Sequence, residues 1–158
     1  MNILKLYLET TVFNRYFEPE RDSCGDTRQL FEEIAAEKFE AYTSQYVVDE
    51  LANAGEPKRG EMFSLLTKYN IPILEKSKET EFLANQYAFH QIISEKHMYD
   101  RLHIACAAVG GMDAIVSFNF THINRLSTKE KTGLVNRLNG YPAVTIILPM
   151  EVIGHDDI

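Results

Sequence analysis

The stretch from Met98 to His122 constrains the fold more than any other part of the chain. It has the pattern of a buried helix, a Gly-Gly stop and a short apolar strand. Leu102 and Cys106 share one apolar stripe of this helix, and most of its other faces are apolar as well. Such a helix is normally sandwiched inside a domain, so the carboxylate of Asp100 in its first turn needs a reason. N-terminal capping and metal binding are both open explanations for it.

Strand-like and helix-like segments alternate along the chain. This alternation predicts an α/β fold, a three-layer α/β/α domain with a mostly parallel central sheet. Strands are predicted at residues 3–8, 40–43, 71–74, 114–117 and 144–148, and helices at 12–17, 23–39, 44–52, 57–69, 77–94, 98–109 and 127–138. The predicted helix caps are a Ser23–Asp26 capping box, Ser44, and Ser127 or Thr128. In helix 77–94, four residues align on one face, namely Phe82, Gln86, Phe89 and Ile93, and Leu83 lies beside them.

Length and composition indicate one soluble domain over residues 1–158. The chain is 45% hydrophobic and 25% charged, which is ordinary for a globular protein with a single core. No apolar run is long enough to span a bilayer, and Glu9 ends the short apolar N-terminal run, so neither a membrane protein nor a signal peptide is expected. The two cysteines lack metal-ligand or redox spacing, which favours the cytoplasm. A net charge of −7 argues against broad electrostatic capture of nucleic acid.

Several acidic and amide side chains are expected to converge at one edge of the sheet. Glu9 and Asn119 each follow a predicted strand, and sites in parallel α/β sheets form at the carboxyl ends of strands. Glu50 and Asp100 lie on helices that can pack over the same edge. Oxygen ligands of this kind suit Mg²⁺ or Mn²⁺, and two such ions can support phosphodiester hydrolysis.

Four short motifs carry a resemblance to a known family. They are Tyr7-Leu-Glu-Thr-Thr-Val, Val47-Val-Asp-Glu-Leu, Asp100-Arg-Leu-His-Ile-Ala-Cys-Ala and Val116-Ser-Phe-Asn-Phe-Thr-His-Ile. In order and spacing they resemble a PIN domain, a family of small metal-dependent ribonucleases that includes many VapC-like toxins of toxin–antitoxin pairs. Within it the chain is most similar to a branch with a Glu-Thr-Thr first motif and an Asn-Phe-x-His-Ile last motif. Leu148-Pro-Met-Glu-Val-Ile resembles the family's closing segment.

The resemblance implies a role for particular residues. Glu9, Glu50, Asp100 and Asn119 take the positions of the catalytic metal ligands, and Mg²⁺ or Mn²⁺ is the implied cofactor. Thr11 takes the position of the hydroxyl that steadies the first motif. Ser117 is also expected to support the site, and so is His103, from its place one turn after Asp100, although a hydrogen-bonded core histidine is an equally good interpretation of His103. Asn119 stands where most members carry a fourth Asp, and an amide is a neutral, weaker ligand that cannot act as a base.

By resemblance the chain is expected to be an endoribonuclease acting on single-stranded or structured RNA, with a cognate antitoxin as partner. A homodimer is compatible with the sequence but not dictated by it. A weakly active or inactive PIN-like binding module is the alternative that Asn119 and the acidic balance favour. A phosphoacceptor receiver domain is disfavoured, because Thr10-Thr11 and Leu148-Pro149 occupy the places of its paired acids and its lysine.

Two histidine-containing segments have open interpretations. His97, Asp100 and His103 do not make a zinc motif, because the two histidines point about 120° apart around an ideal helix. A basic segment after Asn119 fits either a phosphate path or a solvated helix start; it comprises His122, Arg125, Lys129 and Lys131.

Overall fold

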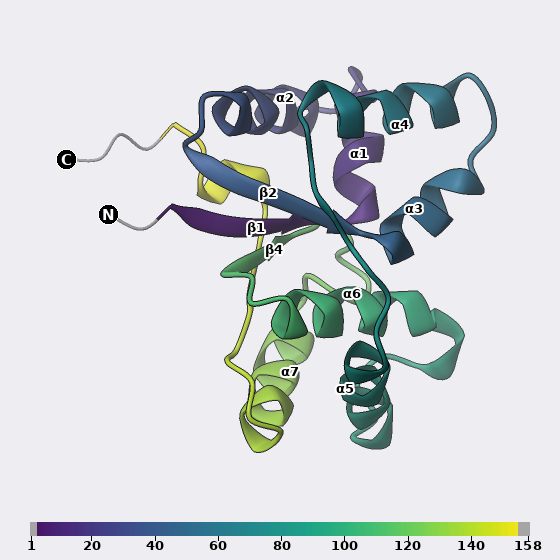
Figure 1. Cartoon of the computed structure of the whole chain (residues 1–158), viewed down its shortest axis with the longest axis vertical. Helices are drawn as coiled ribbons and strands as arrows, with labels where there is room; N and C mark the ends of the chain where they lie inside the picture. Colours follow the sequence, from purple (N-terminus) through teal and green to yellow (C-terminus); the bar gives the residue numbers. More distant parts are fainter. Residues whose placement is uncertain (1–2, 155–158) are drawn as a thin grey trace.

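A computed structural model describes residues 3–154 and places five strands between two layers of helices (Figure 1). The strands are β1 (Leu4–Leu8), β2 (Phe39–Ser44), β3 (Ile73–Leu74), β4 (Ala114–Val116) and β5 (Thr145–Ile147). The helices are α1 (Thr10–Tyr16), α2 (Ser23–Ala35), α3 (Gln45–Ala52), α4 (Lys58–Lys68), α5 (Lys78–Phe89), α6 (Met98–Val109) and α7 (Leu126–Leu138). Two short 3₁₀ turns, η1 (Glu95–His97) and η2 (Pro149–Glu151), complete the described chain.

The sheet has the order β3-β2-β1-β4-β5, and every pairing is parallel. The predicted α/β/α fold with a parallel sheet is therefore confirmed. β1 is central, and its last three residues are fully buried because helices cover both faces. Leu8 pairs with Val116, so the carboxyl ends of β1 and β4 meet at one edge of the sheet. β3 is an edge strand, as Pro72 just before it requires.

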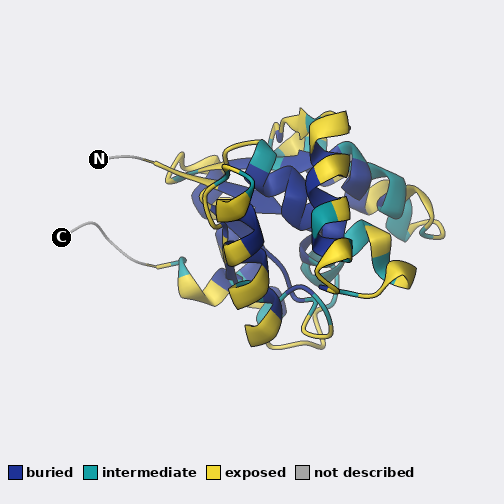
Figure 2. Cartoon of the chain, turned by 90° about the horizontal axis from the view of Figure 1, so that it is seen from below, coloured by how far each residue is buried: buried dark blue, intermediate teal, exposed yellow. Residues whose placement is uncertain are grey.

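The helices divide between the two faces of the sheet. Figure 1 shows α1, α2 and α4 on one side and α5, α6 and α7 on the other. In Figure 2 the buried residues fill the centre, while the outer faces of the helices are exposed. Residues 101–108 of α6 are all buried, which confirms the prediction that this helix is sandwiched. Among residues 3–154, no helix is both long and apolar enough to cross a membrane.

Helix α5 is shorter than predicted, and the aligned face named from the sequence is not its buried one. It ends at Phe89 rather than near residue 94, because the chain turns where Gln91 and Ile93 adopt positive φ. Phe82 and Phe89, on the aligned face named from the sequence, are 54% and 79% exposed. The buried stripe instead carries Leu83 and Tyr87, whose hydroxyl donates a hydrogen bond to the Asn136 amide oxygen of α7. Contacts with α6 and α7 select this stripe over the other apolar face.

Three helix starts were predicted from capping patterns, and one is confirmed. The Ser44 hydroxyl accepts a hydrogen bond from Val47 N at 3.3 Å and caps α3. The Ser23–Asp26 capping box is wrong, because α2 begins at Ser23 and its hydroxyl accepts a bond from Arg15 instead. The Ser127 or Thr128 cap is also wrong: α7 begins at Leu126 without a side-chain cap, and the hydroxyl of Thr128 donates to the carbonyl of His122.

Candidate metal centre

Glu9 lies at the tip of β1, where the chain turns directly into α1. Its side chain is directed back over the strand ends and is only 2% exposed. Oε1 accepts hydrogen bonds from the Thr11 hydroxyl at 2.6 Å, the Ser117 hydroxyl at 2.7 Å and the Thr11 N–H at 3.3 Å. Burial raises the pKa of Glu9, and the charge of His103 and these hydrogen bonds offset only part of that rise. Glu9 is thus a rigidly held carboxylate with little water around it.

Thr11 joins the tips of two neighbouring strands. Its hydroxyl donates to Glu9 and accepts from the backbone N–H of Phe118 at 2.8 Å, in the turn that follows β4. Ser117 makes a second link, since its hydroxyl donates to Glu9 and accepts from Asn119 N at 3.0 Å. The Glu-Thr-Thr and Ser-Phe-Asn motifs therefore form one hydrogen-bonded unit at the edge of the sheet.

Glu50 approaches the same edge from α3. Its Oε1 lies 2.6 Å from His103 Nε2 and also accepts a hydrogen bond from the Thr10 hydroxyl. His103 is fully buried on α6, and its Nδ1 lies 2.7 Å from the hydroxyl of Tyr7. That hydroxyl lies 2.6 Å from the Ser44 hydroxyl. Both imidazole nitrogens of His103 are thereby engaged, and the chain Ser44–Tyr7–His103–Glu50 spans β2, β1, α6 and α3.

The charges near this hydrogen-bonded series favour the protonated form of His103 and the ionised form of Glu50. Burial acts to lower the pKa of His103, but the hydrogen bond to Glu50 and the nearby negative charges of Glu50, Glu9 and Asp100 raise it overall. Burial acts to raise the pKa of Glu50, yet the bond and the charge of His103 outweigh it, and the pKa of Glu50 is lowered. The negative charges around His103 thus act against the effect of burial on its pKa.

Asp100 takes part in a second group of polar contacts beside the first. Its Oδ1 accepts a hydrogen bond from Asn119 Nδ2 at 3.2 Å, and its Oδ2 lies 2.9 Å from His122 Nδ1. It makes no capping bond, because the N-cap of α6 is His97, whose ring stacks on that of His122 with 3.9 Å between centroids. The Asn119 amide oxygen accepts from His122 N at 3.0 Å. Ligation of a cation by that oxygen requires it to release this bond.

The structure therefore arranges the four predicted ligands in two adjoining groups. Ligand atoms of Glu9, Glu50 and His103 lie within 4.8 Å of one another, and so do those of His97, Asp100 and His122. Across residues 3–154 no protein hydrogen bond is made to Oε2 of Glu9 or of Glu50, so each carboxylate has one anchored and one open oxygen. This is a suitable donor set for a cation, since the protein fixes the carboxylates and leaves an oxygen to bind it.

Comparison with known proteins adds a likeness of fold. No family model and no curated protein sequence matches the chain. Among solved structures, it is similar to a chain in the crystal structure of VapBC2 from Rickettsia felis bound to a DNA fragment from their promoter. The TM-score is 0.61 at 13% sequence identity, and the match covers 92% of this chain and 98% of that chain. At this identity the comparison shows a shared fold alone.

Several residues of the site were not singled out from the sequence. Thr10 and Tyr7 lie within the first motif, but nothing in the local sequence indicates that they contact Glu50 and His103. His97 was rejected as a partner of His103, and the structure pairs it with His122 instead. A usable signal was present, because His97 precedes Asp100 by three residues and His122 follows Asn119 by three.

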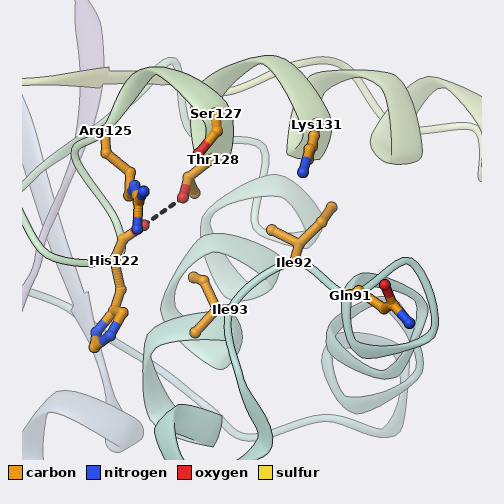
Figure 3. A pocket seen from close by; sticks show the side chains of 8 residues that line it. All are labelled: Gln91, Ile92, Ile93, His122, Arg125, Ser127, Thr128 and Lys131. Carbon is orange, nitrogen blue, oxygen red and sulfur yellow. Dashed lines mark hydrogen bonds between the residues drawn. The ribbon is translucent and has the colours of Figure 1, made fainter.

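A small basic pocket adjoins the Asp100 group. It has a volume of about 220 Å³ and no acidic lining residue, and it opens at the start of α7 (Figure 3). Arg125 and Lys131 are the basic side chains at its mouth, and Ile92 and Ile93 form its apolar wall. His122 also lines the pocket (Figure 3), and its Nδ1 lies 2.9 Å from Asp100 Oδ2. His122 thus connects the pocket to the carboxylates.

Proposed function

We propose that this chain is a metal-dependent endoribonuclease of the PIN type and the toxin of a toxin–antitoxin pair. The observation that carries the proposal is the convergence of Glu9 and Glu50 beside His103, with Asp100 three residues before His103 on α6, at the carboxyl edge of a parallel sheet. Three elements supply these carboxylates, namely the tip of β1, α3 and α6. Acidic side chains brought together in this way repel one another unless a cation offsets their charge.

The chemistry of the donors favours Mg²⁺ or Mn²⁺. Carboxylate oxygens are the preferred ligands of hard divalent ions, and Glu9 and Glu50 each keep one oxygen open. When bound, such ions activate water and stabilise the charge that develops in phosphodiester hydrolysis. Asp100 would complete the set. Asn119 would orient Asp100 through its amide N–H, and its oxygen would join the ligands only after leaving the His122 N–H.

His103 would act as a positioning residue in this proposal. It is fully buried with both nitrogens engaged, so it has no free atom with which to contact RNA. By holding Oε1 of Glu50, it fixes the direction of the open oxygen. Thr11 and Ser117 do the same for Glu9.

The pocket at the start of α7 suggests where an RNA strand would lie. Arg125, Lys131 and the uncapped first turn of α7 give it a positive character in a chain whose net charge is −7. Phosphates of a strand that crosses the carboxylates would be bound there, while the acidic remainder of the surface would repel other nucleic acid. Of the two interpretations of this basic segment, we favour the phosphate path.

The solved structure of similar fold, in which VapBC2 is bound to promoter DNA, supports an antitoxin as the proposed partner. By analogy this chain would be held by an antitoxin whose own DNA-binding part recognises a promoter. The motif resemblance to VapC-like toxins points the same way.

A cleavage assay on a labelled single-stranded RNA tests the proposal. Activity should require Mg²⁺ or Mn²⁺ and vanish in chelator, and Glu9→Gln or Asp100→Asn should lower it roughly 100-fold or more, because metal charge stabilisation contributes several kcal/mol. Glu40→Gln is the matched control, since Glu40 is exposed near the opposite end of β2. Cleavage at the wild-type rate by Asp100→Asn would place the activity elsewhere.

Asn119 favours a second candidate, a PIN-like binding module without strong activity. Its N–H donates to Asp100, where a carboxylate would add a ligand. RNA binding in the presence of Mn²⁺, with no cleavage by either the wild type or Asn119→Asp, would support this alternative over the enzyme.

A further inference from the structure

We propose a second metal position, formed by His97, Asp100 and His122, that takes a divalent transition metal such as Zn²⁺ or Co²⁺ rather than Mg²⁺. It shares Asp100 with the carboxylate site, but it does not rest on the proposed ribonuclease function. The evidence is the geometry of the three side chains, the way in which their backbone is fixed, and the chemistry of their donor atoms.

The distances between the donor atoms fit a metal ion. One atom from each of the three side chains lies within 4.8 Å of the others, and His122 Nδ1 is 2.9 Å from Asp100 Oδ2. Ligands bonded to a metal at about 2.1 Å lie about 3 Å apart when they subtend a right angle. The His122–Asp100 pair therefore already has the separation of two neighbouring ligands, and a ring nitrogen of His97 lies within 4.8 Å of both.

The three residues come from two parts of the fold. His97 is the N-cap of α6, and Asp100 lies three residues later in its first turn. His122 lies in the turn that follows β4, where its N–H donates to the Asn119 amide oxygen at 3.0 Å and its carbonyl accepts from Thr128. The rings of His97 and His122 stack at 3.9 Å with 32° between their planes. This contact holds the two rings side by side, and one nitrogen of each lies within 4.8 Å of the other and of an Asp100 oxygen.

The donor set determines the kind of ion. Two imidazoles and one carboxylate suit Zn²⁺, Co²⁺, Ni²⁺ and Fe²⁺, whereas Mg²⁺ prefers oxygen ligands alone. Three protein ligands leave positions open for water or for a phosphate oxygen. The side chains of Asp100 and His122 are 12% and 22% exposed, so the position is reachable from solvent. By contrast, His103 in the neighbouring group has both nitrogens engaged and offers none to a metal.

A calorimetric titration of the metal-free protein with Zn²⁺ tests the proposal. His97→Ala and His122→Ala should each weaken Zn²⁺ binding at least tenfold, while Glu9→Gln and Glu50→Gln leave it within twofold. His97 makes no capping hydrogen bond, so His97→Ala should fold normally even if His122→Ala disturbs its turn. His90→Ala is the control, because His90 is exposed and stacks only on Phe89 among the aromatic residues described.

Binding of Co²⁺, observed by NMR, provides an independent test. In proton spectra of the wild type, the ring signals of His97 and His122 should shift or broaden on addition of Co²⁺, and those of His90 should not. Equal Zn²⁺ affinity in wild type and His97→Ala would overturn the proposal and leave His122–Asp100 as a hydrogen-bonded pair only. So would a loss of affinity confined to Glu9→Gln and Glu50→Gln. Zn²⁺ binding by His97 and His122 without RNA cleavage would refute the proposed function but not this metal position.

Discussion

At the scale of single residues, one hydroxyl couples the two strand tips of the site. Thr11 Oγ1 donates to the buried Glu9 carboxylate and accepts from the N–H of Phe118, so the same atom orients a proposed ligand and closes the turn after β4. Removal of the hydroxyl leaves a backbone donor without its partner and takes one hydrogen bond from a carboxylate whose pKa burial raises. Such losses are costly because the groups cannot turn to water.

Thr11→Ala is therefore expected to destabilise the protein by about 1–3 kcal/mol, whereas Thr11→Ser should retain most of the stability because it keeps the hydroxyl. Urea unfolding of the wild type and both variants measures the difference. Cleavage or Mn²⁺ affinity should fall in Thr11→Ala and recover in Thr11→Ser. Equal unfolding midpoints for the two variants would show that the methyl group, and not the hydroxyl, is what matters.

The same scale shows which residues of the site a sequence can indicate. Glu9, Thr11 and Ser117 were expected from the motif resemblance, and the structure brings them together within hydrogen-bonding distance. Their catalytic roles are still proposals. Tyr7 could not be assigned a partner, because it meets His103 at a position 96 residues later in the chain. Contacts of that kind depend on how α6 packs on the sheet, which no local pattern specifies.

At the scale of elements, the sequence predicted every strand of the sheet and most helix positions. Short branched runs before polar tips identified β1, β4 and β5 because the buried strands of a parallel sheet are apolar on both faces. The sequence does not indicate which apolar face of α5 is buried. Phe82 and Phe89 are as apolar as Leu83 and Tyr87, and only the contacts with α6 and α7 decide which pair is buried. Capping patterns also failed where a serine or threonine found a tertiary partner.

Helix α7 is the element whose proposed role is most directly testable. Its first turn has neither a side-chain cap nor an acidic residue, and Arg125 and Lys131 flank the pocket there. Asp100→Asn should bind RNA without cutting it and serves as the background. In it, Arg125→Gln with Lys131→Gln should reduce the slope of log RNA affinity against log salt concentration by about one for each phosphate contact that is lost. Fluorescence anisotropy at several KCl concentrations measures the slope.

Arg137→Gln provides the matched control for this change, because Arg137 is exposed in the last turn of the same helix. It should leave the slope unchanged, since it removes a positive charge remote from the pocket. If Arg137→Gln and the double variant reduce the slope equally, the pocket has no special part in binding, and the helix start is merely solvated.

At the scale of the whole molecule, the acidic site links metal binding to folding. The net charge of −7 includes Glu9 and Glu50, which the fold brings together beside His103. An unfolded chain has no such arrangement. A cation that binds only the folded state therefore stabilises it by mass action, by about 2.7 kcal/mol at a concentration 100 times its dissociation constant.

Mn²⁺ should accordingly raise the melting temperature of the wild type in a concentration-dependent way, and chelator should reverse the rise. Glu9→Gln should abolish most of this response without lowering the metal-free melting temperature. The reason is that burial raises the pKa of Glu9, so at neutral pH its ionised form is less favourable in the folded chain than in the unfolded one, and an amide avoids that cost. Scanning calorimetry of both proteins, with and without Mn²⁺, checks the two expectations together. A wild-type melting temperature that does not move in millimolar Mn²⁺ would mean that the open oxygens of Glu9 and Glu50 do not form a metal site, and Glu9 would then be a buried structural carboxylate.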